Sequence, residues 1–398
     1  MNNEQQEKRD RKFKESIQDL IVENFAIPNG SFCNIPESRV QLLLTDNKKP
    51  MYVRQYLIAR SLQPILDDQI KQWKENKIIE LAPVNCTWNS PLIVVKQLTH
   101  DGNIKHRVCI DPRHINKRIM DDKHPLTPVW EQLLQFHDIA HISIIDLQKG
   151  FNQFEIAPES REITTFTHNG QHYVFRGAPF GLKTLPAIFQ RVMRKILGDL
   201  PFVTNYMDDV FIITHKGGNH HDHVSAVIKR LTLANLRINS DKSKFDQTCV
   251  RILGHIITPD GIATDPEKVN CILAWPRPQT GQHIMSFLGL VNYLGHLIPK
   301  LAQVSTPLNR LRQVSQIAES DWTQDCEDSF QALKNILKER PFLSHPDYTQ
   351  DFFVATEEYS INGTMASPVT LTSLLNHYLQ QRATTLLLRK NSTLLSSH

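Results

Sequence analysis

The chain has 398 residues, of which 40% are hydrophobic and 22% are charged, a composition that excludes a disordered or fibrous protein and suggests two to four globular domains. The formal net charge of +4 is compatible with a polyanionic partner without requiring one, because Lys and Arg can gather along one channel. The six cysteines form no CxxC pair and no run of about 18 apolar residues occurs, so we expect free thiols and a soluble protein without a membrane-spanning segment.

Residues 1–50 open with a charged stretch and carry turn signals at residues 28–30, without a sustained hydrophobic period. We predict a partly disordered linker there, cut from a longer polyprotein. Further along, apolar residues from Ile65 to Trp73 recur at helical spacing, which predicts a helix that ends near Asn76.

Strand-like runs then alternate with helical stretches. Strands are predicted at PLIVVKQ, RVCID, HISIIDL, ITTFT, HYVFRG and DVFIIT, and helices at PAIFQRVMRKILGDL and HHDHVSAVIKRLTLANL. This mixture favours an α+β core with a largely antiparallel sheet. Residues 280–313 and 322–340 predict further helices in later, separate subdomains, before a strand candidate at DFFVAT.

Acidic residues stand at the ends of two apolar strands. In FVTNYMDDVFIIT two apolar segments flank Asp208 and Asp209, as in a β-hairpin that lifts both carboxylates above a sheet, and Asp146 ends the run HISIID. Taken alone, an Asp-Asp pair is a weak signal, and a solvated hairpin tip without a metal explains it better. Three carboxylates at one sheet edge could hold two Mg²⁺ ions about 4 Å apart, an arrangement suited to in-line phosphoryl transfer.

Ordered blocks surround these acids. IDLQKGFNQFEI, GAPFGLKTLPAIFQRVM and YMDDV resemble the catalytic motifs of reverse transcriptases, and RVCIDPRHINK precedes them at the expected place. ILGHIITPDGIATDPEKV and FLGLVNYLGHLIPKLAQVSTPL are similar to later blocks of gypsy-class LTR retrotransposon polymerases. The resemblance spans roughly residues 50–355 and concerns the reverse transcriptase part of a Pol polyprotein.

The resemblance implies a metal site. Asp146, Asp208 and Asp209 would be the catalytic carboxylates, and the backbone carbonyl of Leu147 would be a further metal ligand. The cofactors would be two Mg²⁺ ions, with Mn²⁺ as a substitute. The alternative is three unrelated surface acids.

The resemblance also implies nucleotide-binding residues. Phe151 would close off space beside the sugar 2′ carbon, or be a core aromatic, and Arg107 would meet the triphosphate, or form a surface ion pair. Lys96 would contact the triphosphate, although Gln97 replaces the second lysine of relatives and a plain surface lysine is the alternative. Phe180 would line the nucleotide pocket or belong to the palm core.

Two further segments are assigned in the same way. Leu253, Gly254 and His255 resemble the primer grip, where glycine would permit close approach of the primer phosphates, and a turn without a ligand is the alternative. Lys242 stands near the place of a lysine proposed to protonate pyrophosphate. The cluster formed by His220, His221 and His223 is interpreted as a solvated loop because no cysteine stands at zinc-ligand spacing.

The implied fold is an α+β right-hand polymerase with fingers, palm and thumb. Residues 51–255 would form fingers and palm, 256–315 a thumb-like helical region, 316–350 the connection, and 351–398 a truncated, degenerate ribonuclease H-like segment. Glu357 or Glu358 could replace the first ribonuclease H carboxylate, but no acidic residue follows in the tail, so we expect no ribonuclease H activity.

The expected function is that of an RNA- and DNA-templated DNA polymerase. Its partners would be an RNA or DNA template with a primer, and deoxynucleoside triphosphates, in the cytosol, a virus-like particle or the nucleus. Oligomeric state stays open. A catalytically silent fragment that retains nucleic-acid binding is the alternative, favoured by the departures at Gln97 and at Thr184 and Leu185. A free-standing ribonuclease is disfavoured by its missing carboxylates.

Overall fold

The computed structural model describes residues 3–45, 50–98, 104–125, 129–133, 136, 139–339 and 341–344, and two short strands beyond them. The chain divides into two units, residues 1–345 and 346–398. In the second unit β14 (Phe353–Val354) pairs antiparallel with β15 (Val369–Thr370). Glu357, Glu358 and the predicted ribonuclease H-like segment otherwise lie outside the described residues.

A four-stranded sheet forms the centre of the first unit. Its order is β7 (Val203–Tyr206), β8 (Asp209–His215), β4 (Ile139–Asp146) and β9 (Lys244–Gln247), and every neighbouring pair is antiparallel. The β-branched residues that dominate β4 and β8 suit a pleated, buried surface. This is the antiparallel sheet predicted from the sequence.

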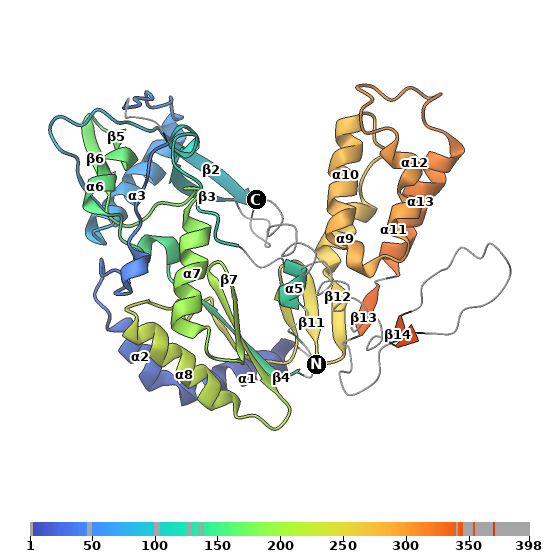
Figure 1. Ribbon diagram of the computed structural model, residues 1–398, viewed down its shortest axis with the longest axis horizontal. Coiled ribbons are helices and arrows are strands. Elements are labelled where there is room, and N and C mark those ends of the chain that lie inside the picture. The colour runs from blue at the N-terminus through green and yellow to red at the C-terminus, as the bar shows by residue number, and fades with distance from the viewer. Residues whose placement is uncertain are drawn as a thin grey trace, which may run out of the picture. The chain divides into compact units, whose positions relative to one another are not determined.

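Two amphipathic helices lie beside this sheet (Figure 1). Helix α7 (Leu185–Leu197) begins with a proline in its first turn, buries a face that runs from Ile188 to Ile196, and ends at Gly198. Helix α8 (His220–Leu233) is capped by Asn219, whose side chain accepts hydrogen bonds from two backbone N–H groups of the first turn. Both helices were predicted.

The N-terminal region corrects the predicted linker. Helices α1 (Asn3–Ser16) and α2 (Gln18–Phe25) fold there and pack against β9 and α8. Arg9 forms a 2.9 Å ion pair with Asp246 on β9, and the buried side chain of Asn24 is hydrogen-bonded to the segment after α8. Much of this anchoring is polar, so no hydrophobic period revealed the helices.

The strands around residues 79–175 form two smaller sheets. β2 (Leu92–Leu98) and β3 (Ile104–Ile110) make an antiparallel pair, and β6 (Gln171–Phe175) lies between β1 (Ile79–Leu81) and β5 (Phe166–His168). Helix α3 (Gln63–Glu75) has Asn76 as its C-cap, as predicted, and its Trp73 packs edge-on against Phe175 with ring centroids 5.2 Å apart.

Short helical segments connect these elements. They are α4 (Arg113–Asn116), α5 (Val129–Leu133), α6 (Pro158–Arg161), and the 3₁₀ helices η1 (Pro36–Ser38), η2 (Arg60–Leu62), η3 (Gly150–Gln153) and η4 (Glu162–Thr164).

The region after residue 249 has a second sheet and an all-helical core. The sheet runs β10 (Val250–Ile252), β11 (His255–Thr258), β12 (Gly261–Thr264), β13 (Phe342–Ser344). The helices are α9 (Pro266–Leu273), α10 (Gly281–Tyr293), η5 (Gly295–Leu297), α11 (Leu301–Val304), α12 (Thr306–Asn309) and α13 (Gln324–Lys338).

This region corrects two sequence predictions. The helical stretch within 280–313 is interrupted after Tyr293, where η5 follows, and Pro299 with the left-handed Lys300 separates η5 from α11. The predicted boundary between thumb and connection at residue 315 does not separate two cores. Phe330 of α13 packs on Phe287 of α10, with ring centroids 4.8 Å apart, and both residues belong to one buried cluster.

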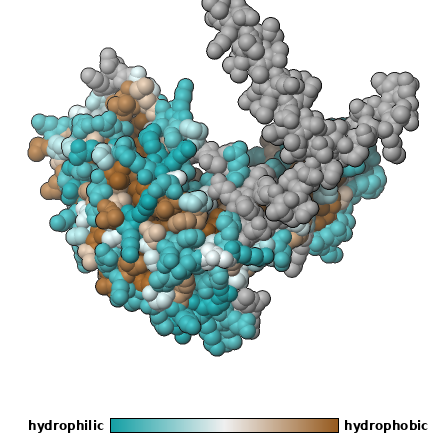
Figure 2. All heavy atoms as spheres, turned by 60° about the horizontal axis from the view of Figure 1, so that its bottom comes forward, coloured by the Kyte–Doolittle hydropathy of each residue, from teal (hydrophilic) through white to brown (hydrophobic). Residues whose placement is uncertain are grey.

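The described surface carries no single dominant apolar face in the view of Figure 2, where apolar patches are interrupted by hydrophilic side chains. Among the described helices, none is both long and apolar enough to cross a membrane.

Candidate active site

Strand pairing brings the three predicted carboxylates to one edge of the central sheet. Asp146 is the last residue of β4 and Asp209 the first of β8, and their Cα atoms are direct register partners. Asp209 also pairs with Tyr206 on β7, so Met207 and Asp208 form the two-residue tip of the β7–β8 hairpin. Met207 adopts a left-handed φ of 50° at this tip. The hairpin predicted from the sequence is therefore present.

Burial makes these carboxylates electrostatically unfavourable. The Oδ1 atom of Asp208 is buried and has no hydrogen-bond partner. Burial, reinforced by the charges of Asp209 and Asp146, raises the pKa of Asp208 to about 6. Burial and Asp146 also raise the pKa of Asp209, and burial raises that of Asp146 despite the nearby charge of Lys242. Such a cluster is stabilised when a cation lies between its members.

The described side chains alone do not complete a coordination shell for a metal ion. Among the residues that the structure describes, no three His, Cys, Asp or Glu side chains converge closely enough to hold a metal ion by themselves. An all-carboxylate donor set with an orphaned buried oxygen suits Mg²⁺, which takes much of its coordination shell from water and phosphate oxygens. The residues present thus fit Mg²⁺.

A cleft of about 380 Å³ opens beside the carboxylates. Asp146, Leu147 and Asp208 line it from the sheet, and Lys242 lies at its edge. Strand β3 contributes Lys105 to Ile110, and the segment before α7 contributes Pro179 and Phe180. Cationic groups, an aromatic ring and carboxylates therefore face one space.

Residues 98–257 match the family model described as Reverse transcriptase (RNA-dependent DNA polymerase). The chain carries a reverse transcriptase domain. The matched segment contains Asp146, Asp208 and Asp209, and the family predicted from the sequence motifs is confirmed.

Curated relatives are transposon polyproteins. The chain is 33% identical over 340 residues to the Retrovirus-related Pol polyprotein from transposon 297 of Drosophila melanogaster, an alignment that covers 84% of this chain and 32% of the relative. It is 31% identical over 329 residues to the corresponding polyprotein from transposon gypsy of the same organism, covering 79% and 31%. The chain thus spans about a third of the length of these relatives.

Solved structures confirm the polymerase fold. A foamy viral protease-reverse transcriptase in complex with double-stranded DNA has a TM-score of 0.74 at 24% identity, over 87% of this chain and 59% of that one. A second structure of the foamy viral enzyme, also with double-stranded DNA, has a TM-score of 0.72 at 22% identity, over 98% and 83%.

Only some of the predicted nucleotide-binding residues line the cleft beside the carboxylates. Arg107 lines the cleft. Phe180 also lines the cleft, 39% exposed, and its ring lies 5.3 Å from that of Phe151, which is nearly buried. Lys96 lies on β2 opposite His106 and is not among the residues that line the cleft. The cleft thus includes Arg107 and Phe180 but not Lys96.

Two neighbours of Asp146 were not singled out from the sequence. Lys149 lines the cleft, adopts a left-handed φ of 50°, and has its pKa lowered by burial. At Gly150 an added Cβ would lie 2.7 Å from Asp208 Oδ1, so only glycine leaves that carboxylate in place. Both residues are visible in the string DLQKGF. Their importance depends on the backbone angle of Lys149 and on the contact of Gly150 with Asp208, which only the folded structure shows.

The predicted primer-grip residues form a tight hairpin turn. Leu253 and Gly254 link β10 to β11 and have φ values of +47° and +68°. Two consecutive left-handed residues are typical of a type I′ hairpin, which glycine adopts easily and leucine does not. His255 Nδ1 lies 3.0 Å from the Leu253 carbonyl oxygen.

The histidine cluster departs from its predicted solvated loop. His220 is buried in the first turn of α8, where its Nε2 lies 2.7 Å from Ser143 Oγ and its Nδ1 2.7 Å from Thr214 Oγ1. His223 also hydrogen-bonds to Thr214, whereas His221 is exposed. The loop interpretation was wrong for His220, because its ring is buried and hydrogen-bonded on both nitrogens, and the partner Ser143 on β4 lies 77 residues away in sequence.

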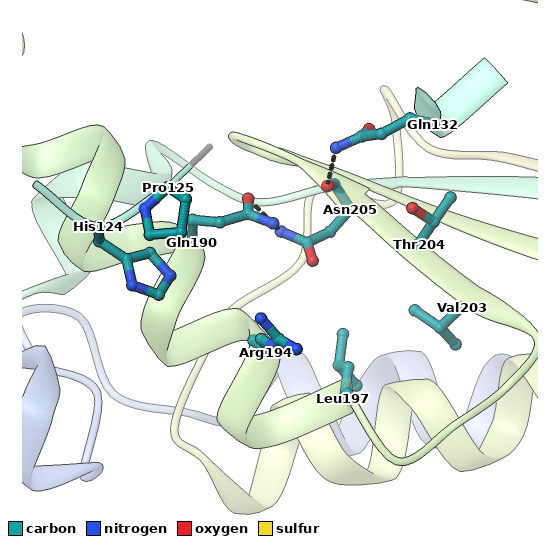
Figure 3. A pocket seen from close by; sticks show the side chains of 10 residues that line it. His124, Pro125, Gln132, Gln190, Arg194, Leu197, Val203, Thr204 and Asn205 are labelled. Carbon is teal, nitrogen blue, oxygen red and sulfur yellow. Dashed lines mark hydrogen bonds between the residues drawn. The ribbon is translucent and has the colours of Figure 1, made fainter. Parts of the chain in front are cut away.

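A second hollow of about 250 Å³ lies between α7 and β7, away from the carboxylates (Figure 3). Gln132 donates to the Asn205 carbonyl and Asn205 donates to Gln190, so these amides point toward one another across the hollow. Arg194 and His124 complete its polar lining. None of the predicted site residues lines it.

Proposed function

We propose that this chain is an RNA- and DNA-templated DNA polymerase that adds deoxynucleotides to a primer 3′-hydroxyl. The observation that carries the proposal is the register pairing of Asp146 with Asp209, which sets the buried, unpartnered Asp208 Oδ1 at a cleft beside Arg107. Its partners would be a template with a primer and deoxynucleoside triphosphates. The foamy viral structures in complex with double-stranded DNA and with an RNA/DNA hybrid support this choice of partner.

Asp146, Asp208, Asp209 and the backbone carbonyl of Leu147 would hold two Mg²⁺ ions. When bound, the ions supply activation of the attacking hydroxyl and charge neutralisation at the leaving pyrophosphate. Arg107 would orient the triphosphate, since a guanidinium stays charged and donates several hydrogen bonds to phosphate oxygens. Phe151 would close off space beside the sugar 2′ carbon, Phe180 would line the nucleotide pocket, and Lys242 would lie near the leaving pyrophosphate.

A primer-extension assay on poly(rA)·oligo(dT) with Mg²⁺ tests the proposal. We expect incorporation by the wild type and its loss in Asp208→Asn. Activity that survives in Asp208→Asn would contradict the metal site, and salt-dependent duplex binding without any incorporation would instead identify a silent nucleic-acid-binding protein. We propose the cytosol, a virus-like particle or the nucleus as its location.

A further inference from the structure

The β10–β11 turn is held in place from two helices. The Leu253 carbonyl accepts a hydrogen bond from the Tyr293 hydroxyl at the end of α10, in addition to its contact with His255. The imidazole of His255 also stacks on the Tyr293 ring, with centroids 5.5 Å apart. A leucine in a left-handed conformation is strained, and these contacts fix the strained carbonyl.

Lys268 of α9 lies directly over this turn. Its Nζ is 3.5 Å from the centroid of the Tyr293 ring. A Cβ added to Gly254 would approach Lys268 Nζ to 2.1 Å, so the ammonium occupies the side of the turn that glycine leaves bare. Turn, tyrosine and lysine therefore form one surface element.

Lys268 forms no ion pair with a described residue, and the charge of nearby Asp265 only partly offsets the effect of burial on its pKa. The two nearest acids in sequence, Asp265 and Glu267, both pair with Arg251, at 3.3 and 2.9 Å. The lysine is half-buried, and that burial lowers its pKa. A partly desolvated ammonium that lies over a π face and forms no direct ion pair can still bind an anion.

The turn is continuous with the catalytic hairpin. Leu253 and Tyr206 pack against the same apolar cluster, which includes Phe211 and Ile252. Tyr206 stands two residues before Asp208, at the end of β7. A polynucleotide whose 3′ end reaches Asp208 thus has a short path to the turn.

On this basis we infer that Lys268 binds a backbone phosphate of the primer strand and that Tyr293 positions both the ammonium and the turn. The inference rests on the proposed polymerase function and names a residue outside the predicted primer grip. Gly254 leaves the space that the Lys268 side chain occupies, and the Lys268 ammonium supplies the charge for the phosphate. Tyr293 acts through its ring and its hydroxyl as a positioning residue.

Equilibrium binding of a dideoxy-terminated primer–template between 50 and 200 mM KCl tests the inference. For Lys268→Met we expect affinity about tenfold lower at low salt, and a plot of log affinity against log salt whose slope is shallower by about 0.7 to 0.9, the loss of one phosphate contact. Lys268→Arg should keep the wild-type slope. Lys216→Met, at an exposed turn between β8 and α8, is the matched control and should leave the slope unchanged.

Tyr293→Phe separates the two roles. It keeps the ring beneath the ammonium but removes the hydroxyl that binds the Leu253 carbonyl, so it should weaken binding several-fold without a change of slope. If Lys268→Met lowers the melting temperature but binds with the wild-type slope, the lysine only clamps Tyr293 and the inference is overturned. A wild type that binds no primer–template would overturn the proposed function together with it.

Discussion

Asp208 is held in an environment that an isolated carboxylate would avoid. Its buried Oδ1 lacks a donor and its pKa of about 6 lies above the ordinary value of 3.8. Because the folded state binds this proton more tightly than the unfolded state does, ionisation of Asp208 destabilises the fold. The penalty is absent below pH 3.8, grows as the pH rises to about 6, and is complete above it.

Replacing Asp208 by Asn should therefore stabilise the metal-free protein while it removes polymerase activity. At pH 7.5 we expect the free energy of unfolding to rise by roughly 1 to 3 kcal/mol, from the shift in pKa. Urea titrations in EDTA measure this, and the difference should shrink at pH 4.5. Added Mg²⁺ should stabilise the wild type more than the variant, and equal stabilisation of both would count against the site.

A substitution at Gly150 tests whether the position of the Asp208 carboxylate depends on the space beside it. In Gly150→Ala the new Cβ would lie 2.7 Å from Asp208 Oδ1 and displace it. We expect primer extension to fall about 100-fold or more, since catalysis by positioned groups is sensitive to shifts near 1 Å. Gly217→Asn is a suitable control, because a Cβ at Gly217 would meet open space and Asn tolerates the left-handed φ of +87° at that position. Full activity in Gly150→Ala would refute the contact.

At the scale of elements, the N-terminal helices are part of the palm. Asn24 on α2 is 1% exposed, donates 2.9 Å hydrogen bonds to Thr232 Oγ1 and the Leu236 carbonyl, and accepts one of 2.8 Å from Ile238 N–H. One side chain thus joins α2 to the segment that follows α8, which then leads past Asp146 to β9.

Asn24→Ala should cost about 2 kcal/mol of stability, because it leaves a buried carbonyl and a buried N–H without partners. Chemical denaturation of the purified chain gives this value directly. The exposed neighbour Glu23 provides the control, and Glu23→Ala should change the free energy of unfolding by less than about 0.5 kcal/mol. If Asn24→Ala also changed the free energy of unfolding by less than about 0.5 kcal/mol, α2 would not be an integral part of the fold.

The sequence predicted the main strands and helices between residues 63 and 236, because alternation, proline and turn signals there are local, whereas β9, β10 and β11 were not predicted. It placed Asp146, Asp208 and Asp209 at strand ends for the same reason. It could not reveal α1 and α2, whose attachment depends on pairs such as Arg9 with Asp246, or the single core that Phe287 shares with Phe330. Those contacts join residues that no short window contains.

At the scale of the whole molecule, the stability of the fold depends on pH through two buried groups that act in opposite directions. Asp208 destabilises the fold as the pH rises, whereas His220 destabilises it as the pH falls. Burial, followed by the charge of His141, lowers the pKa of His220 from 6.5 to about 4. The unfolded chain therefore binds this proton first as the pH falls. The contribution of neutral His220 is complete above pH 6.5 and is lost as the pH falls to about 4.

His220→Asn should flatten the acid side of the stability profile. Between pH 6.5 and 4.5 the wild type should lose more stability than the variant, by on the order of 2 to 3 kcal/mol, although the variant starts from a lower value because its hydrogen bonds to Ser143 and Thr214 are weakened. Melting temperatures at half-unit pH steps show this. His221→Asn, at an exposed ring, should reproduce the wild-type profile.

The contact between α1 and β9 also constrains the order of folding steps during synthesis of the chain. Gln6 reaches the carbonyl of Asp246 across 240 residues, so the first helix leaves the ribosome long before the strand on which it docks has been synthesised. Closing so long a loop is a late step, and the palm sheet keeps an uncovered edge strand until then. A nascent chain interrupted before β9 would hold Asp146, Asp208 and Asp209 on a sheet that lacks its last strand.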